Sequence, residues 1–340
     1  MKNYKVAVVG ATGAVGLEMI RMLEIRNFPV GNIKFLASER SIGKKLKFRG
    51  EEISVELLTK NCDKDIDIAL FSAGTAISKK FAPIFVNNGS FVIDNSNAWR
   101  MDKNVPLVVP EVNSHVLEKN KKLIANPNCS TIQMVVVLKP LHDFVKIKRV
   151  IVSTYQSVSG AGQKGKDELT EQIKAWVNGY KIPVANKFQH QIAFNLIPQI
   201  DIFMNNGYTK EEMKMTNETK KIIGDDSIKV SATCVRVPVF RSHSESVWIE
   251  TEKPLSSVKA KKIFSKAKGI QLLDDPKNNR YPMPLFAENN QITFVGRIRS
   301  DISTNNNNAL TFWIVSDNLL KGAALNAVQI AEVIIGNNFV

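Results

Sequence analysis

Residues 4–16 read Tyr4-Lys5-Val6-Ala7-Val8-Val9-Gly10-Ala11-Thr12-Gly13-Ala14-Val15-Gly16 and carry the strongest fold signal in the chain. The apolar residues 6–9 predict a buried strand, and the glycines predict a tight turn into a helix that runs to about Arg26. In a nucleotide-binding α/β domain, such glycines let the backbone approach a pyrophosphate, whose charge the helix N-terminus then holds. The spacing departs from the usual G-x-G-x-x-G, so a plain tight turn is the alternative.

The rest of the first half alternates short apolar strands with helical segments, which predicts a parallel, doubly wound sheet of the Rossmann type. The expected strands are Ile33–Ala37, Ile66–Phe71, Phe91–Ile93, Leu107–Val109 and Leu123–Ala125, and the expected helices are Ala76–Asn87 and Ser114–Lys119.

The second half has longer runs of strand character with few crossovers, which predicts an α+β domain with a mixed sheet covered by helices. The expected strands are Arg149–Val158, Lys229–Val239, Val247–Thr251, Ile292–Arg299 and Leu310–Val315; the expected helices are Lys164–Asn178, Lys210–Ile223 and Leu255–Ala267; and Asn305–Asn308 is expected to be a surface loop. We therefore predict a nucleotide-binding domain over residues 1–128 and a catalytic domain over 129–317. A closing helix in residues 318–340 is expected to pack back against the first domain.

The composition narrows the class of protein. The chain has 340 residues, 44% of them hydrophobic, which is enough for two cores, and no apolar run approaches the roughly 18 residues that cross a bilayer. The net charge is +14, but the lysines are scattered, without a basic run or interleaved aromatic residues. This pattern argues against nucleic acid and membranes as partners and allows small anionic ligands.

The three cysteines (Cys62, Cys129 and Cys234) lie far apart and have neither a disulfide framework nor metal-ligand spacing. We therefore expect no metal and a reducing, cytoplasmic location in which a reactive thiol survives.

The end of the second expected strand indicates which nucleotide is bound. NAD sites usually carry an acid there, whereas NADP sites offer a small hydroxyl and an arginine to the 2′-phosphate. Ser38, Arg40 and Ser41 favour NADP, although Glu39 lies among them and a solvated turn is the alternative. Ser72 follows another strand and is expected to pass close to the cofactor.

Cys129 is the candidate nucleophile. It stands between Asn128 and Ser130, after the turn Asn126-Pro127, at the start of an apolar segment that predicts a buried helix. A helix N-terminus favours a thiolate, through its dipole and its free N–H groups. The alternative is a small buried side chain, which is how we interpret Cys62 and Cys234.

A cysteine nucleophile needs an acid or base. The chain offers His115, His142, His190 and His243. We favour His243, because it lies in a polar stretch, residues 241–246, between two strong strands, but spacing alone leaves the others open.

These features together resemble aspartate-semialdehyde dehydrogenases from the first strand to the last helix. The resemblance is carried by Gly10–Gly16, Asn126–Ser130, the run Gln156-Ser157-Val158-Ser159-Gly160-Ala161-Gly162, Arg236, His243 and the closing residues 318–324. It implies a fold like that of glyceraldehyde-3-phosphate dehydrogenase and a homodimer or homotetramer. It also implies NADPH-dependent reduction of aspartyl phosphate to aspartate semialdehyde and phosphate, on the branch to diaminopimelate, lysine, threonine and methionine.

The resemblance also implies residue roles. Cys129 would carry the acyl group, His243 would be the acid/base, and Gln156 would orient the intermediate; Arg236 would clamp the substrate carboxylate beside Glu211. Arg100, Asn128 and Lys214 would hold phosphate. Contacts with NADP would come from Thr12, Gly13, Ala14, Val15, Arg40, Ser41, Ser159, Gly160 and Asn318, in addition to Gly10, Ser38 and Ser72 at the strand ends.

The residue types suit these roles, but alternatives remain. A planar guanidinium matches a carboxylate, and Arg236 lies in an otherwise apolar strand, where a buried cation needs an anion. Arg241 is its rival for the clamp. Glu211 and Lys214 share one face of an expected helix, and without the resemblance they would be an ordinary i,i+3 ion pair.

Two other functions compete with this interpretation. One is a sister enzyme with the same chemistry, such as N-acetyl-glutamyl-phosphate reductase or glyceraldehyde-3-phosphate dehydrogenase. The other is a basic protein that uses its nucleotide domain to bind nucleic acid or to sense NADP; it would have an unreactive Cys129 and salt-dependent DNA binding.

Overall fold

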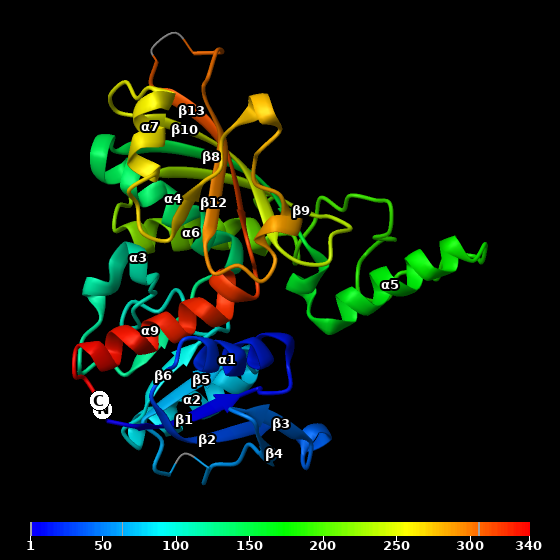
Figure 1. The fold of residues 1–340 in the computed structure, drawn as a ribbon, viewed down its shortest axis with the longest axis vertical. Coiled ribbons are helices and arrows are strands. Elements are labelled where there is room, and N and C mark those ends of the chain that lie inside the picture. Colours follow the sequence, from blue (N-terminus) through cyan, green and yellow to red (C-terminus); the bar gives the residue numbers. More distant parts are fainter. Residues whose placement is uncertain (1, 63, 305–306) are drawn as a thin grey trace. The chain divides into compact units, whose positions relative to one another are not determined.

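The parallel sheet expected in the first half is present in the computed structural model, which describes residues 2–62, 64–304 and 307–340 (Figure 1). The chain divides into two compact units, Met1–Asn128 with Ala323–Val340, and Cys129–Gly322. The first unit contains β1 (Tyr4–Val9), α1 (Ala14–Ile25), β2 (Val30–Ala37), β3 (Lys45–Phe48), β4 (Glu51–Leu57), β5 (Ile68–Phe71), α2 (Thr75–Asn87), β6 (Phe91–Asp94), α3 (Pro110–Asn113), β7 (Leu123–Ala125) and α9 (Leu325–Gly336).

The strand order among the described residues is β3-β4-β2-β1-β5-β6-β7, and every pair is parallel except β3 with β4. The chain moves from β1 outward to β2 on one side and from β5 outward to β6 on the other. Right-handed crossovers therefore place α1 and α2 on opposite faces of the sheet. Helix α9 packs against α1 and β6. On the α2 face, Ala7, Val9, Phe71, Phe81 and Phe85 form part of one buried cluster.

The second unit carries a mixed sheet of order β11-β12-β13-β10-β8-β9, in which β8–β9 and β11–β12 are parallel and the other pairs are antiparallel. Its elements are α4 (Cys129–Val145), β8 (Ile147–Gln156), α5 (Gln163–Val177), α6 (Lys210–Ile223), β9 (Lys229–Arg236), β10 (His243–Thr251), α7 (Ser257–Phe264), β11 (Ile270–Leu272), α8 (Pro284–Ala287), β12 (Thr293–Ser300) and β13 (Ala309–Ser316). The predicted combination of a Rossmann-type parallel sheet and an α+β part with a mixed sheet is confirmed.

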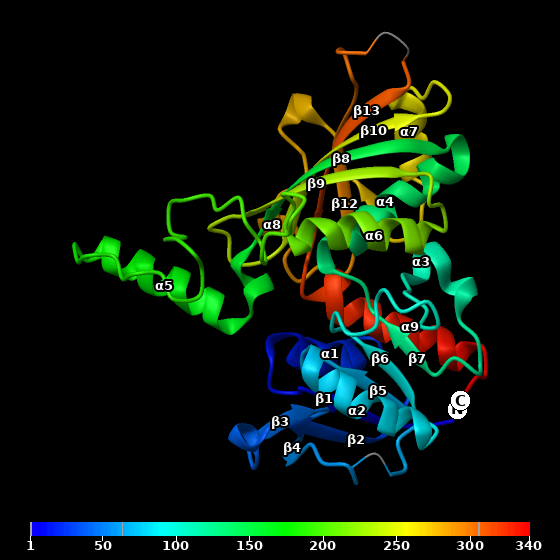
Figure 2. The same ribbon diagram turned by 180° about the vertical axis from the view of Figure 1, so that it is seen from behind.

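Helices cover one face of the mixed sheet. Helices α4 and α6 lie side by side against β8, β9 and β10, and α7 packs on β11 and β12 (Figure 2). Along β8 the side chains alternate, so that Val150, Val152 and Thr154 are buried beneath these helices, whereas Ile151 on the other face is 47% exposed. Helix α5 projects away from this sheet together with the segment that follows it (Figure 1).

Several predicted elements differ from the structure. Residues Leu107–Val109 form only one bridge, Leu107 with Ala125, because Pro110 already begins a helix there. The expected helix Ser114–Lys119 is a 3₁₀ turn over Ser114–Val116. Of the expected loop Asn305–Asn308, Asn305 and Asn306 lie outside the described residues.

Two further differences concern strands and the last helix. The hairpin β3–β4 was not expected, because its strands are charged; its turn uses positive φ at Arg49 (50°) and Gly50 (85°), as two-residue hairpin turns require. Strand β10 begins at His243, four residues earlier than expected. The closing helix begins with a π-helical segment, Leu320–Ala324, before α9. Within the described residues, no helix is long and apolar enough to cross a bilayer.

Candidate active site

The glycine turn of the first unit joins the ends of β1 and β5 tightly. Gly10 has φ of +82°, and a Cβ there would lie 2.6 Å from the carbonyl oxygen of Ser72. A Cβ at Gly16 would collide with the carbonyl oxygen of Gly10. Both positions therefore need glycine, and Ser72, which is predicted to pass close to the cofactor, lies against this turn.

A cavity of about 310 Å³ opens at this turn. Five of the residues predicted to bind the cofactor line it, and Ala14 and Val15 begin the adjoining helix α1. No side chain caps Gly13 at the start of α1, and no acidic residue lies in its first turn, so its N–H groups suit an anion. The cavity is lined by Gly10, Thr12, Gly13, Ala37, Ser38, Leu58, Ser72, Ala73, Ile77 and Phe81.

The residues that follow β2 lie beside this turn. The hydroxyls of Thr12 and Ser41 are 3.0 Å apart and share a hydrogen bond, which ties the loop after β2 to the glycine turn. Ser38, Glu39 and Arg40 are exposed. A hydroxyl and a cation are therefore available to a ligand in the cavity, together with one carboxylate.

Arg100 is buried in the first unit. Its Nη2 donates to the carbonyl oxygen of Asn95 at 2.9 Å. Burial raises the pKa of Asp94, and the charge on Arg100 counts partly against that effect. Asn128 is also buried, and its neighbour Asn126 donates to the side chain of Asn95 at 2.7 Å.

In the second unit, three predicted site residues occupy the ends of adjacent strands. Gln156 ends β8 and pairs in register with Arg236, which ends the parallel strand β9. On the other side of β8, Ser244 pairs with Tyr155, so His243 at the start of β10 lies beside the same end. The strand order β9-β8-β10 thus gathers an amide, a guanidinium and an imidazole.

The hydrogen bonds of His243 define its tautomer. Its side chain is fully buried, and Nδ1 accepts a hydrogen bond from the backbone N–H of Ser157 at 3.0 Å. Burial, reinforced by the charge of Arg236, lowers the pKa of His243 to about 3. The neutral ring therefore carries its proton on Nε2. Nε2 has no hydrogen-bond partner among the described residues, and it lies 3.2 Å from where a Cβ on Gly160 would be.

Arg236 is also buried, and its Nη1 donates to the carbonyl oxygen of Ser157 at 2.7 Å. Burial lowers its pKa, against the opposing influence of Glu211 and Cys129. It forms no ion pair with a carboxylate in the described part of the chain, whereas its rival Arg241 is bound to Asp317 at 2.7 Å. Arg236 is thus the better candidate for an external carboxylate.

Glu211 and Lys214 are more than an exposed helix pair. Glu211 is 5% exposed; it accepts from Gln156 Nε2 at 3.1 Å and lies 3.0 Å from Lys214 Nζ. Lys214 also contacts Asp201 at 2.9 Å. Burial works to lower the pKa of Lys214, but the two carboxylates outweigh it and the pKa is raised. Gln156, Glu211 and Lys214 therefore form one polar chain.

Cys129 is the first residue of α4 and the least buried of the three cysteines. Its charge influences the pKa of Arg236, so the sulfur lies within electrostatic reach of that guanidinium. Burial raises the pKa of Cys234, and Cys62 donates to the carbonyl oxygen of Thr59 at 2.8 Å. Both environments are those of structural thiols.

Asn318, Ser159 and Gly160 lie in the second unit, around His243. Asn318 Oδ1 accepts from the hydroxyl of Ser159 at 3.0 Å and from the N–H of Ser242 at 2.9 Å. These bonds tie together the loops on both sides of the imidazole. They are structural contacts that sequence reasoning missed, as it missed Ser157, although that residue stands within the run that carried the family resemblance.

The other histidines have different surroundings, and those of the second unit, His142 and His190, lie outside this cluster. His115 and His190 are exposed. His142 lies near the end of α4, 3.5 Å from Asp225, and its Nδ1 accepts from the N–H of Ile147. Of the three histidines in the second unit, only His243 joins the other candidate residues.

Comparison with known proteins agrees with this arrangement. Family models described as semialdehyde dehydrogenase match the chain twice, an NAD binding domain over residues 5–120 and a dimerisation domain over residues 138–321. The aspartate-semialdehyde dehydrogenase of Aquifex aeolicus is 57% identical over 98% of each chain, and that of Bacillus subtilis is 50% identical over 97% of each.

Solved structures give the same result. The crystal structure of aspartate semialdehyde dehydrogenase II from Vibrio cholerae, complexed with ASA, matches with a TM-score of 0.95 and 48% identity over 99% of both chains. The enzyme from Candida albicans with NADP matches with a TM-score of 0.78 and 25% identity over 100% of both. The resemblance found in the sequence is confirmed: the chain belongs to the aspartate-semialdehyde dehydrogenase family.

Proposed function

We propose that this chain reduces L-4-aspartyl phosphate to L-aspartate 4-semialdehyde and phosphate with NADPH, through a thioester on Cys129. The product leads to lysine, threonine, methionine and diaminopimelate. The observation that carries the proposal is a helix-terminal thiol within electrostatic reach of Arg236, in a cluster whose other members are Gln156 and a neutral His243. None of the three cysteines forms a disulfide in the described part of the chain, which suits a reducing compartment such as the cytoplasm.

The nucleophile is the Cys129 thiolate. It lies at the N-terminus of α4, where backbone N–H groups and the helix dipole favour negative charge, and Arg236 adds a cation. The sulfur attacks the acyl carbon, and the bond to phosphate breaks. This leaves a thioester and free phosphate, and the phosphate oxygen takes the electron pair.

His243 stabilises the oxyanions that form on the acyl carbon. Its Nδ1 is occupied by the N–H of Ser157, so its proton is on Nε2 and is available to a developing oxyanion. When bound, the nicotinamide nucleotide supplies the hydride that reduces the thioester carbonyl. Collapse of the resulting oxyanion expels the Cys129 sulfur as a thiolate, and no proton from His243 is consumed. The family resemblance implies an acid/base role for His243. Of that role, we assign to His243 the donation of a hydrogen bond to the oxyanion.

The α-carboxylate and the α-amine of the substrate are each held by a side chain of opposite charge. Arg236 offers a buried planar guanidinium without a carboxylate partner, which suits the α-carboxylate. Glu211 provides a buried carboxylate for the α-amine, and Gln156, hydrogen bonded to it, orients the acyl group. A substrate with a free amine fits this pair better than an N-acetylated one, which favours aspartyl phosphate over N-acetyl-glutamyl phosphate.

The phosphate is assigned to Arg100, Asn128 and Lys214. Buried Arg100 and partly buried Lys214 supply two positive charges, and the amide of Asn128 supplies hydrogen bonds. Charge-assisted hydrogen bonds of this kind are the strong ones in phosphate recognition.

The cofactor is assigned as NADP. Arg40 is exposed beside the cavity at the glycine turn, Ser38 lines that cavity, and Ser41 is hydrogen bonded to Thr12. An arginine with small hydroxyls suits a 2′-phosphate, and the Candida albicans relative was solved with NADP. Glu39 would favour NAD, so the ratio of the two activities is the relevant measurement.

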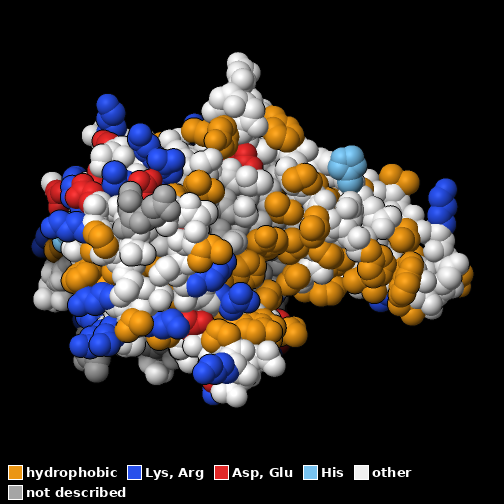
Figure 3. All heavy atoms as spheres, turned by 90° about the horizontal axis from the view of Figure 1, so that it is seen from above, with side chains coloured by type: hydrophobic (Ala, Val, Ile, Leu, Met, Phe, Trp, Pro, Cys, Tyr) orange, Lys and Arg blue, Asp and Glu red, His pale blue; other side chains and the backbone are white. Residues whose placement is uncertain are grey.

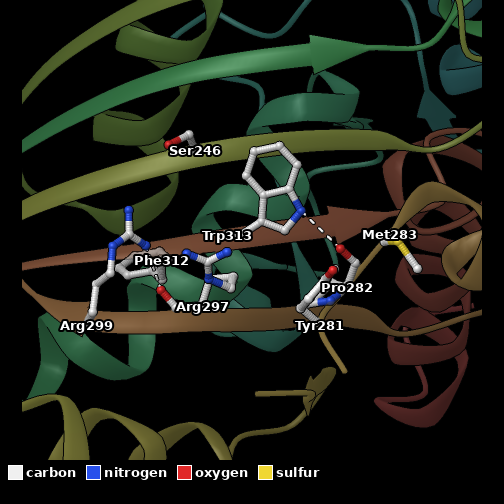
Figure 4. A pocket seen from close by; sticks show the side chains of 8 residues that line it. All are labelled: Ser246, Tyr281, Pro282, Met283, Arg297, Arg299, Phe312 and Trp313. Carbon is white, nitrogen blue, oxygen red and sulfur yellow. Dashed lines mark hydrogen bonds between the residues drawn. The ribbon is translucent and has the colours of Figure 1, made fainter. Parts of the chain in front are cut away.

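The open face of the mixed sheet is proposed as the surface that binds a second copy of this chain in a homodimer or homotetramer. Figure 4 shows Trp313 there, with its Nε1 donating to the carbonyl oxygen of Pro282 at 3.1 Å, beside Arg297 and Arg299. A cavity of about 340 Å³ lies at this place.

A second apolar surface lies on the part that carries α5. Figure 3 shows apolar side chains gathered there, and Trp176 of α5 is 59% exposed. Exposed apolar side chains that gather on one surface are typical of an interface.

A substrate panel tests the proposal. The purified chain is assayed for NADP reduction by aspartate semialdehyde, N-acetyl-glutamate semialdehyde and glyceraldehyde 3-phosphate, each with and without phosphate. We expect phosphate-dependent activity with the first only, its loss in Cys129→Ser, and its retention in the matched control Cys62→Ser. Equal activity of Cys129→Ser, or a preference for another aldehyde, would reject the proposal.

A further inference from the structure

Glu245 is a buried acid that the proposed chemistry does not use. It lies in β10 two residues after His243, so both side chains are on the helix-covered face of the sheet. Its register partners are Thr154 in β8 and Ile314 in β13. The side chain is fully buried.

The carboxyl group of Glu245 has no charged partner within residues 2–62, 64–304 and 307–340. No lysine, arginine or histidine of the described part of the chain forms an ion pair with it, and neither of its oxygens has a hydrogen bond of normal geometry. Burial raises its pKa well above the usual range, and the amide of Gln133 counts against this only in part. A carboxyl in such surroundings is uncharged at neutral pH and has one O–H to donate.

Gln133 lacks what a protonated carboxyl supplies. It lies in α4 one turn after Cys129 and is fully buried. Its Nε2 donates to the main-chain carbonyl of His243 at 3.4 Å, while its Oε1 has no hydrogen-bond partner in the part of the chain that the structure describes. An unpaired buried acceptor is costly, so an O–H donor at Glu245 would satisfy both groups.

We propose that Glu245 is a positioning residue which, as an uncharged acid, donates to Oε1 of Gln133, so that this amide is fixed against the carbonyl of His243. The pair then joins the helix that carries the nucleophile to the strand that carries the oxyanion donor. Helix α4 also packs on β10, so the link acts across an existing contact. The activity readout rests on the proposed function.

The other groups around Glu245 do not supply a competing charge. Thr154 and Ile314 are uncharged, and His243 is neutral because its pKa is lowered to about 3. Cys234 of β9 interacts with Glu245, but its thiol is neutral because burial raises its pKa. The carboxylates of Glu211 and Glu212 in α6 act on that same thiol and would favour protonation of a further acid nearby.

Four variants test the inference. Glu245→Gln keeps a donor without an ionisable group, and Glu245→Met keeps the size without hydrogen bonding. The double variant Gln133→Glu and Glu245→Gln exchanges the two side chains, so that the pair still has one acid and one amide. Glu250→Gln is the matched control, because Glu250 lies on the same strand but in an ion pair with Arg149 at 3.2 Å.

We expect kcat within about twofold of the original chain for Glu245→Gln, for the exchange and for the control. In Glu245→Met, kcat should fall about 10- to 100-fold while the KM of the semialdehyde stays within about twofold, because misplacement of reacting groups by about 0.5 to 1 Å has effects of that size. The alkylation rate of Cys129 by iodoacetamide should fall with it. This rate needs no substrate, so it judges the inference even if the chain proves to act on another aldehyde.

A pH series tests the protonation separately. A carboxyl whose pKa is raised on folding costs stability as pH rises above its ordinary value, so the original chain should lose stability relative to Glu245→Gln between pH 5 and 8. The slope should correspond to one proton bound on folding. A difference in stability between the original chain and Glu245→Gln that does not vary with pH would overturn the inference. So would an unchanged kcat and an unchanged alkylation rate in Glu245→Met. A fall in kcat in Glu245→Gln as large as that in Glu245→Met would overturn it as well. If Glu245→Met does not fold, the infrared difference between the original chain and Glu245→Gln decides: a carboxylic-acid carbonyl band supports the inference and a carboxylate band overturns it.

Discussion

Replacing Gly322 with alanine would place a methyl group against the proposed nucleophile. A Cβ at this position would lie 2.9 Å from Cys129 Cβ and 3.3 Å from its Cα. Ordinary carbon–carbon contact is about 3.6 Å, so the first turn of α4 must move by about 0.7 Å. The contact is with backbone and Cβ atoms, which no rotamer change can relieve.

The expected loss follows from that displacement. Misplacing reacting groups by about 1 Å costs about 100-fold, so about 0.7 Å predicts roughly a 25-fold fall in kcat/KM, or about 2 kcal/mol. Overpacking should also lower the free energy of unfolding by about 1–3 kcal/mol. The KM of the nucleotide should change less than kcat, because the glycine turn and the residues assigned to the 2′-phosphate lie in the other unit.

Steady-state kinetics and the alkylation rate of Cys129 measure the effect together with urea unfolding. Gly336→Ala is the matched control, since a Cβ at the end of α9 meets nothing within 4 Å; it should leave both rates unchanged. Full activity and an unchanged alkylation rate in Gly322→Ala, in a chain of unaltered stability, would refute the reasoning.

Three further predictions concern charge. The pKa of His243 is lowered to about 3, so its side chain stays neutral in the native state and should give kcat no pH dependence between about pH 5 and 9. In the unfolded chain the same side chain gains a proton near pH 6.5. The free energy of unfolding should therefore fall below that pH, by up to about 1.4 kcal/mol per pH unit relative to His243→Gln. A kcat limb near pH 6.5 that vanishes in His243→Gln would contradict this. Arg236→Lys should raise the KM of the semialdehyde about 10- to 100-fold, because lysine cannot donate two parallel hydrogen bonds; an unchanged KM would remove the clamp from Arg236. Arg40→Glu should lower the preference for NADP over NAD by at least about tenfold, measured as the ratio of kcat/KM, and an unaltered ratio would place the 2′-phosphate elsewhere.

Local patterns were sufficient for most of the fold. The apolar run before Gly10, the turn to Gly16 and the 3.6-residue periodicity of helices such as Lys210–Ile223 are properties of neighbouring residues, and the structure has them. The hairpin β3–β4 was missed because β3 is a short edge strand and each of the two strands buries only one side chain, Phe48 in β3 and Val55 in β4. A one-sided burial pattern is what identifies a strand in sequence.

The candidate site depends on which strand ends meet, which local patterns do not encode. Gln156 is far in sequence from Arg236 and His243, and the order β9-β8-β10 places its strand between theirs. The hydrogen bond from Ser157 that defines the tautomer of His243 depends on the same register. Glu245 gave no signal, because a glutamate in a strand is ordinarily exposed.

The central claim is that the acyl group is carried by Cys129. The chain is incubated with aspartate semialdehyde and NADP without phosphate, quenched in acid and digested, and the peptides are weighed. We predict an aspartyl adduct on the peptide that contains Cys129, released when phosphate is added before the quench. An adduct on Cys62 or Cys234, or no adduct while NADPH accumulates, would contradict the account.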